Sequence, residues 1–133
     1  MPLPSKHCPP GEFQKPICVV DDDESVADSL QSLLESFGFS VRSYRSGTEF
    51  LADERRRLAG CLLIDQHMPG LSGLDVVDNL QKEGVQIPTI LISGRLDAST
   101  KQRATLLGVR ELLEKPVAAG RLIQLLRTTL AEA

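Results

Sequence analysis

The stretch Cys61-Leu62-Leu63-Ile64-Asp65 is a short apolar run that ends directly on a carboxylate. An unbroken apolar run of this length is typical of a strand buried on both faces, as in a parallel sheet. Three further runs also end on polar residues, and the carboxyl ends of parallel strands meet at one sheet edge. These runs are Ile17–Val20 before Asp21, Asp22 and Asp23, Thr89–Ile92 before Ser93, and Leu112–Leu113 before Glu114, Lys115 and Pro116.

Helix-like segments separate these runs. The segment after the first run places Val26, Leu30, Leu33, Leu34 and Phe37 on one face and stops at Gly38. Further helices are expected at 48–58, 72–82, 97–107 and 117–130, with strands at 40–44 and 109–113.

Five strands alternating with five helices predict an α/β fold with a parallel sheet covered on both faces. The second strand is polar enough to lie at an edge. Right-handed crossovers then favour the strand order 2-1-3-4-5. The switch point of this order, where ligands bind, lies between the first and third strands.

The composition of the 133 residues fits one globular domain. The net charge of −3 argues against direct, sequence-independent nucleic-acid binding, and no apolar stretch approaches the roughly 20 residues of a membrane span. Three cysteines without metal-ligand spacing, and no secretory signal, predict a cytoplasmic protein. Residues 1–15 carry four prolines and are expected to form a flexible tail before a domain over 16–133.

Asp21, Asp22 and Asp65 are expected to share one crevice, where their charges repel one another. A divalent cation and Lys115 would offset this repulsion. Mg²⁺ suits carboxylate oxygens and keeps sites for phosphate oxygens, and Mn²⁺ is an alternative. Beside such a cation, Asp65 would be a nucleophile toward phosphorus. Lys115 and the Ser93 hydroxyl would each take a phosphoryl oxygen, and Gly94, without a side chain, would leave the approach to Asp65 open.

Four segments strongly resemble the receiver domain of two-component response regulators, and the resemblance covers residues 16–133. It implies a flavodoxin-like (βα)5 three-layer sandwich. It further implies that Asp65 is the phosphoacceptor, Asp21 and Asp22 the acid pair that holds the metal, and the backbone carbonyl of His67 a further ligand. Ser93 and Lys115 would be the switch pair. The segments are Val19–Asp23, Leu62–Asp65 with Met68–Gly73, Ile92–Gly94 and Glu114–Pro116.

The resemblance, with a chain that stops just after the last expected helix, implies a stand-alone response regulator. Its donor would be a phosphohistidine on a histidine kinase or a histidine phosphotransfer domain. Phosphorylation of Asp65 would change its affinity for an unidentified downstream protein, with a homodimer as another option and with no direct contact to DNA or a membrane. It would catalyse its own phosphorylation and slow dephosphorylation, but act mainly as a signalling switch.

Other functions remain open for the same site. A phosphate shuttle or sink in a phosphorelay would share the fold and all site residues. A pseudo-receiver would bind partners without being phosphorylated, which the complete residue set disfavours. A metabolite phosphatase commonly needs a second aspartate two residues after the nucleophile, and this chain has His67 there.

One position departs from the family pattern, and two others bear on how long the phosphoryl group would last. Leu112 stands where receivers usually carry Tyr or Phe, which puts the usual aromatic switch signal in doubt. His67 and Arg95 occupy the two positions that tune phosphoryl lifetime in the family. A bulky and cationic pair at these positions predicts slow hydrolysis of the phosphorylated form.

Overall fold

The computed structural model describes residues 15–131, and within them five strands form one parallel sheet. The strand order is β2-β1-β3-β4-β5, so the predicted fold class and order are confirmed. The central strand β3 pairs with β1 on one side and β4 on the other. The strands are β1 (Ile17–Val20), β2 (Val41–Tyr44), β3 (Cys61–Asp65), β4 (Thr89–Ser93) and β5 (Glu111–Glu114).

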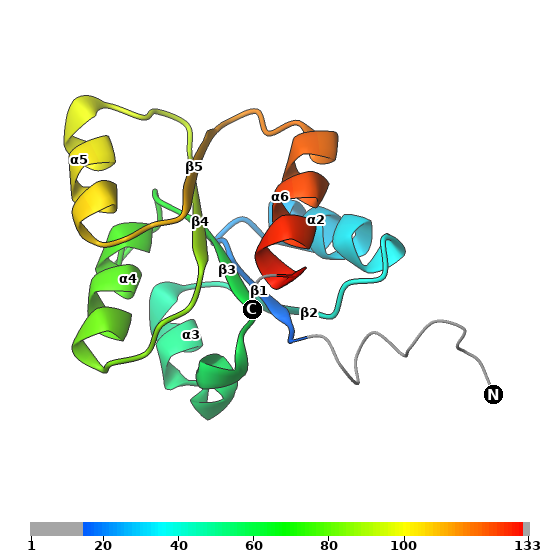
Figure 1. Ribbon diagram of the computed structural model, residues 1–133, viewed down its shortest axis with the longest axis horizontal. Helices are drawn as coiled ribbons and strands as arrows, with labels where there is room; N and C mark the ends of the chain where they lie inside the picture. Colours follow the sequence, from blue (N-terminus) through cyan, green and yellow to red (C-terminus); the bar gives the residue numbers. More distant parts are fainter. Residues whose placement is uncertain (1–14, 132–133) are drawn as a thin grey trace.

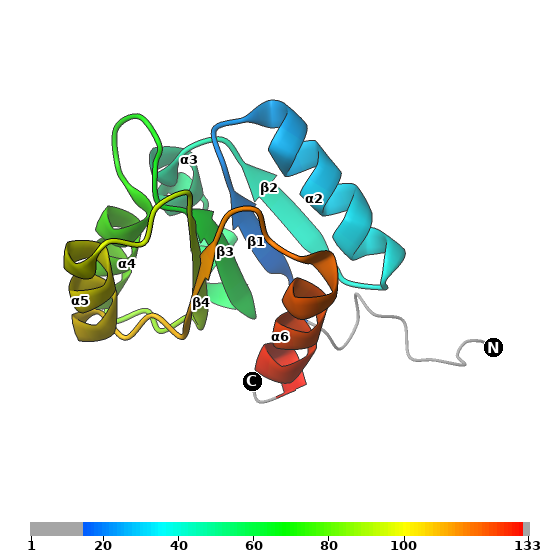
Figure 2. The same ribbon diagram turned by 90° about the horizontal axis from the view of Figure 1, so that it is seen from above.

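The helices cover both faces of this sheet and make three layers. Helices α3, α4 and α5 lie on one face, and α2 and α6 on the other (Figure 1; Figure 2). No helix of the part described is long and apolar enough to cross a membrane. The helices are α2 (Glu24–Ser36), α3 (Gly47–Ala52), the 3₁₀ turn η1 (Glu54–Leu58), α4 (Gly73–Lys82), α5 (Ala98–Leu106) and α6 (Ala119–Ala131).

Strand β3 contributes to both hydrophobic layers because successive side chains of a strand point to opposite faces. Leu62 and Ile64 pack in the cluster beneath α3, α4 and α5, and Cys61 and Leu63 pack in the cluster with α2 and α6. All four side chains are buried. The strand that carries Asp65 is thus held from both sides.

The structure corrects two details of the expected elements. The helix expected over 48–58 is divided at Asp53, which ends α3 and caps η1 by accepting a hydrogen bond from the Arg55 backbone N–H. Val26 on α2 and Phe37, its C-cap residue, were expected on the apolar face of this helix but are 36% and 47% exposed. The expected tail over 1–15 lies outside the described residues, apart from Lys15.

Candidate functional site

Three carboxylates lie together at the carboxyl edge of β1 and β3. Asp21 follows β1, and Asp65 is the last residue of β3; both are buried, whereas the neighbouring Asp22 is exposed. One carboxylate oxygen from each of the three lies within 4.8 Å of the others. The register brings them together because Val20 pairs with Ile64, one residue before each of the two buried aspartates.

The electrostatics of this group favour a cation. Burial raises the pKa of Asp21, and the neighbouring Asp65 and Asp22 raise it further, against the hydrogen bond that its carboxylate accepts from the Asp23 backbone N–H at 2.9 Å. The site can thus hold a divalent metal ion, since it supplies only hard oxygen donors and excess negative charge. The carboxylate of Asp23 is separate from the group, because it caps α2 by accepting a hydrogen bond from the Val26 N–H.

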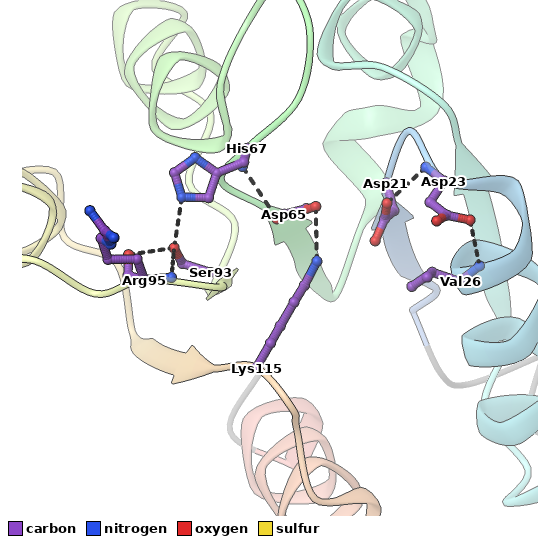
Figure 3. Close-up of polar contacts among 8 residues, drawn as sticks. All are labelled: Asp21, Asp23, Val26, Asp65, His67, Ser93, Arg95 and Lys115. Atoms are coloured by element: carbon purple, nitrogen blue, oxygen red, sulfur yellow. Dashed lines mark hydrogen bonds and ion pairs between the residues drawn. The ribbon is translucent and has the colours of Figure 1, made fainter.

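Lys115 provides a positive charge beside these carboxylates. Its Nζ donates to Asp65 Oδ2 at 3.2 Å, and its side chain is 41% exposed while that of Asp65 is 7% exposed (Figure 3). Asp65 Oδ1 accepts from the His67 backbone N–H at 3.2 Å. The peptide bond between Lys115 and Pro116 is cis. The lysine thus reaches Asp65 from the end of β5, fifty residues away along the chain.

Ser93 and His67 meet on the other side of Asp65. The fully buried Ser93 hydroxyl lies 3.0 Å from His67 Nε2, and it also contacts the backbone N–H and carbonyl of Arg95 (Figure 3). The Arg95 side chain points away from Asp65 in this view. The structure therefore brings His67 and Ser93 into contact, which the sequence alone did not indicate.

The loop after β3 is held by a residue that the sequence analysis did not single out. The Gln66 side-chain oxygen accepts a hydrogen bond from the Leu74 N–H at 2.9 Å, and the Gln66 backbone carbonyl accepts one from the Gly73 N–H at 3.2 Å. Gln66 thus ties the end of β3 to the first turn of α4. A polar residue directly after the strand was the only signal for this role.

Two further predicted positions flank the site. Gly94 is exposed, and a Cβ added there would meet nothing within 4 Å, which leaves that side of the site open. Leu112 is half-buried on β5 and packs against the cluster beneath α3, α4 and α5. It contacts the core at the place where the family pattern has an aromatic ring.

Several known proteins are similar to this chain. The response regulator protein TodT of Pseudomonas putida is 40% identical over 114 residues, which are 86% of this chain and 50% of TodT. The transcriptional regulatory protein FixJ of Azorhizobium caulinodans is 35% identical over 118 residues, or 89% of this chain and 56% of FixJ. A CheY-like receiver domain protein from Methanospirillum hungatei shares the fold with a TM-score of 0.83 and 24% identity, covering 90% of this chain and 95% of that one.

These relatives correct the expected partners. The chain spans about half the length of the curated relatives it matches. FixJ is by name a transcriptional regulatory protein, so the partner set that excluded DNA is contradicted. The net charge of −3 on which that exclusion rested describes only these 133 residues, whereas the match covers only about half of the length of TodT.

A family model described as the response regulator receiver domain matches residues 17–127. The matched range runs from the first residue of β1 into α6 and includes the acidic group, Ser93 and Lys115. Receiver domains act in two-component signalling and are phosphorylated on an aspartate. The chain belongs to the family of response regulator receiver domains.

Proposed function

We propose that the chain accepts a phosphoryl group on Asp65 from a phosphohistidine donor, in a Mg²⁺-dependent reaction, and that this changes its affinity for another protein. One observation carries the proposal: Asp65 is a buried carboxylate placed between two acidic neighbours and the Nζ of Lys115. That placement provides a nucleophile, a site for a cation and a positive charge at one edge of the sheet.

In the proposed transfer, a carboxylate oxygen of Asp65 attacks phosphorus while the bond between phosphorus and the donor's imidazole nitrogen breaks. The electron pair of that bond stays on the imidazole, and Asp65 becomes an acyl phosphate. Asp21, Asp22 and Asp65 would hold Mg²⁺, with the His67 backbone carbonyl as a further ligand. The metal supplies charge neutralisation at a phosphoryl oxygen when bound.

The remaining residues position the phosphoryl group. Lys115 already contacts Asp65 Oδ2, so its ammonium group is placed to pair with a phosphoryl oxygen attached there. Ser93 ends the neighbouring strand β4 and would donate its hydroxyl to another oxygen. Gly94 leaves room for the donor, since it has no side chain and a Cβ added there would meet nothing within 4 Å.

The test is the intact mass of the protein after incubation with Mg²⁺ and a phosphohistidine-bearing donor protein, beside Asp65→Asn. We expect a gain of one phosphoryl group in the parent protein, none in Asp65→Asn, and loss of the gain on chelation of the metal. No gain in the parent with a donor proven active on another receiver would contradict the proposal and favour a pseudo-receiver.

A shuttle in a phosphorelay would use the same site, so the lifetime of the acyl phosphate separates it from a switch. We expect slow hydrolysis, because the bulky His67 follows the end of β3, which carries Asp65, and the cationic Arg95 follows the end of the neighbouring strand β4. Replacing both with alanine should shorten the lifetime of the phosphorylated form. Rapid return of the phosphoryl group to the donor would favour the shuttle.

A further inference from the structure

The Ser93 hydroxyl uses its whole hydrogen-bonding capacity in this structure. Its Oγ donates to the Arg95 carbonyl at 2.7 Å, accepts from the Arg95 N–H at 3.1 Å and lies 3.0 Å from His67 Nε2. A hydroxyl has one hydrogen to donate and two lone pairs to accept with. The three contacts are therefore satisfied together only when His67 Nε2 carries a hydrogen and donates it to Ser93.

This arrangement competes with the proposed role of Ser93. To donate to a phosphoryl oxygen on Asp65, the hydroxyl must leave the Arg95 carbonyl. Figure 3 shows Ser93 turned toward His67 and Arg95, while Lys115 contacts Asp65 from the end of β5. To bind a phosphoryl oxygen, the Ser93 hydroxyl must therefore break its present hydrogen bond to the Arg95 carbonyl and donate to the phosphoryl group instead.

We propose that His67 is a positioning residue that holds the Ser93 hydroxyl in its arrangement before transfer and so opposes its capture of the phosphoryl group. This inference rests on the proposed function. The Arg95 contacts join residues two apart, whereas the His67 contact spans 26 residues and joins the loop after β3 to the last residue of β4. His67 is exposed, so its ring can move into solvent when Ser93 is released.

The first test measures binding of beryllofluoride, a phosphoryl mimic, in the presence of Mg²⁺ by NMR titration. The hydrogen bond between His67 and Ser93 is made only in the protein without beryllofluoride, so its loss in His67→Ala should tighten beryllofluoride binding about threefold to tenfold. The same substitution made in a Ser93→Ala background should have no effect, because the hydroxyl is absent. His67→Gln places an amide N–H at a similar reach and should stay near the parent protein.

The double-mutant comparison separates this role from a general loosening of the loop. A loosened loop would change binding equally in both backgrounds, and that result would overturn the proposal. Failure of the parent protein to bind beryllofluoride would instead contradict the proposed function, and the positioning role would fall with it. Binding by the parent with unchanged affinity in His67→Ala would overturn the positioning role alone.

A second readout needs neither metal nor phosphoryl mimic. The ¹⁵N chemical shifts of the neutral His67 imidazole should show almost only the tautomer with hydrogen on Nε2 in the parent protein, a larger share than in a free imidazole. Ser93→Ala should shift that population toward the mixture of a free imidazole. An unchanged tautomer ratio in Ser93→Ala would overturn the proposal.

Discussion

Cys18 and Cys61 lie on the neighbouring strands β1 and β3, and both side chains are fully buried. Burial raises the pKa of Cys18 to about 11 and that of Cys61 to about 12. At pH 8 only about 0.1% or less of each would be thiolate, the reactive form. In a Cys8→Ser protein, we expect no rapid reaction with a disulfide reagent in the folded state and two reacting thiols in denaturant. A thiol that reacts rapidly with the reagent in the folded protein would contradict the burial of these two cysteines.

The raised pKa of Asp21 has a consequence for stability. Burial is its largest cause, and a carboxyl whose pKa is higher folded than unfolded destabilises the fold once ionised. The free energy of unfolding should therefore fall as pH rises from the unfolded pKa through the folded one. Asp21→Asn removes this charge and should therefore stabilise the metal-free protein at pH 7.

Mg²⁺ should make the parent protein more stable than Asp21→Asn, the reverse of their order without the metal. A bound cation stabilises the folded parent by mass action, whereas Asp21→Asn loses one ligand charge. Thermal unfolding in chelator and then in Mg²⁺ measures both effects with one method. An Asp21→Asn protein that is less stable than the parent in chelator would contradict the assigned electrostatics.

At the scale of elements, α4 approaches the end of β3 so closely that only glycine fits at its first position. A Cβ on Gly73 would lie 2.7 Å from Leu91 Cδ1 and 2.8 Å from the backbone oxygen of Asp65. Gly73→Ala should push α4 away from the site and cost about 1–3 kcal/mol of stability. Urea unfolding measures the cost, and Mg²⁺ affinity should fall as well.

Gly120 offers the matched control for this substitution. It lies in the first turn of α6, and an added Cβ would meet nothing within 4 Å. Gly120→Ala should be neutral or stabilise the protein by up to about 1 kcal/mol, because alanine favours a helix over glycine. Equal losses in both variants would contradict the specific contact of Gly73 with Asp65.

The elements also show how far the sequence determines the structure. The strands and their order could be predicted because buried parallel strands are continuous apolar runs, and the polar residues after them met at one edge as expected. The break at Asp53 was missed because 48–58 contains no glycine or proline to mark it. There Asp53 accepts hydrogen bonds from Arg55 and, at 2.7 Å, from the Tyr44 hydroxyl on β2.

The contacts inside the site were harder to predict than its residues. Motifs name side chains, but the hydrogen bond between His67 and Ser93 depends on how the loop after β3 approaches the end of β4, 26 residues away along the chain. Val26, in the first turn of α2, likewise belongs to the predicted apolar stripe but is 36% exposed. A hydrophobic stripe specifies a helix face but not how far along the helix that face is covered.

For the whole molecule, β3 makes the site depend on both layers of the core. Leu126 on α6 is fully buried in the cluster that includes Cys61 and Leu63 of β3, on the face away from α4. Leu126→Ala should cost about 2–5 kcal/mol, since it leaves a cavity against the strand that carries Asp65. Leu106→Ala on α5 should cost little, because Leu106 is 78% exposed.

The sharing of β3 also predicts how the Leu126→Ala protein loses its function on denaturation. Because one strand carries side chains of both layers, the layers should unfold together as a two-state domain. Far-UV circular dichroism and the Mg²⁺-induced NMR shifts of the site should then vanish at one urea concentration, which lies lower in Leu126→Ala than in Leu106→Ala. Loss of the Mg²⁺ shifts well after circular dichroism had changed would mean that the α3–α5 layer and the site persist without α6.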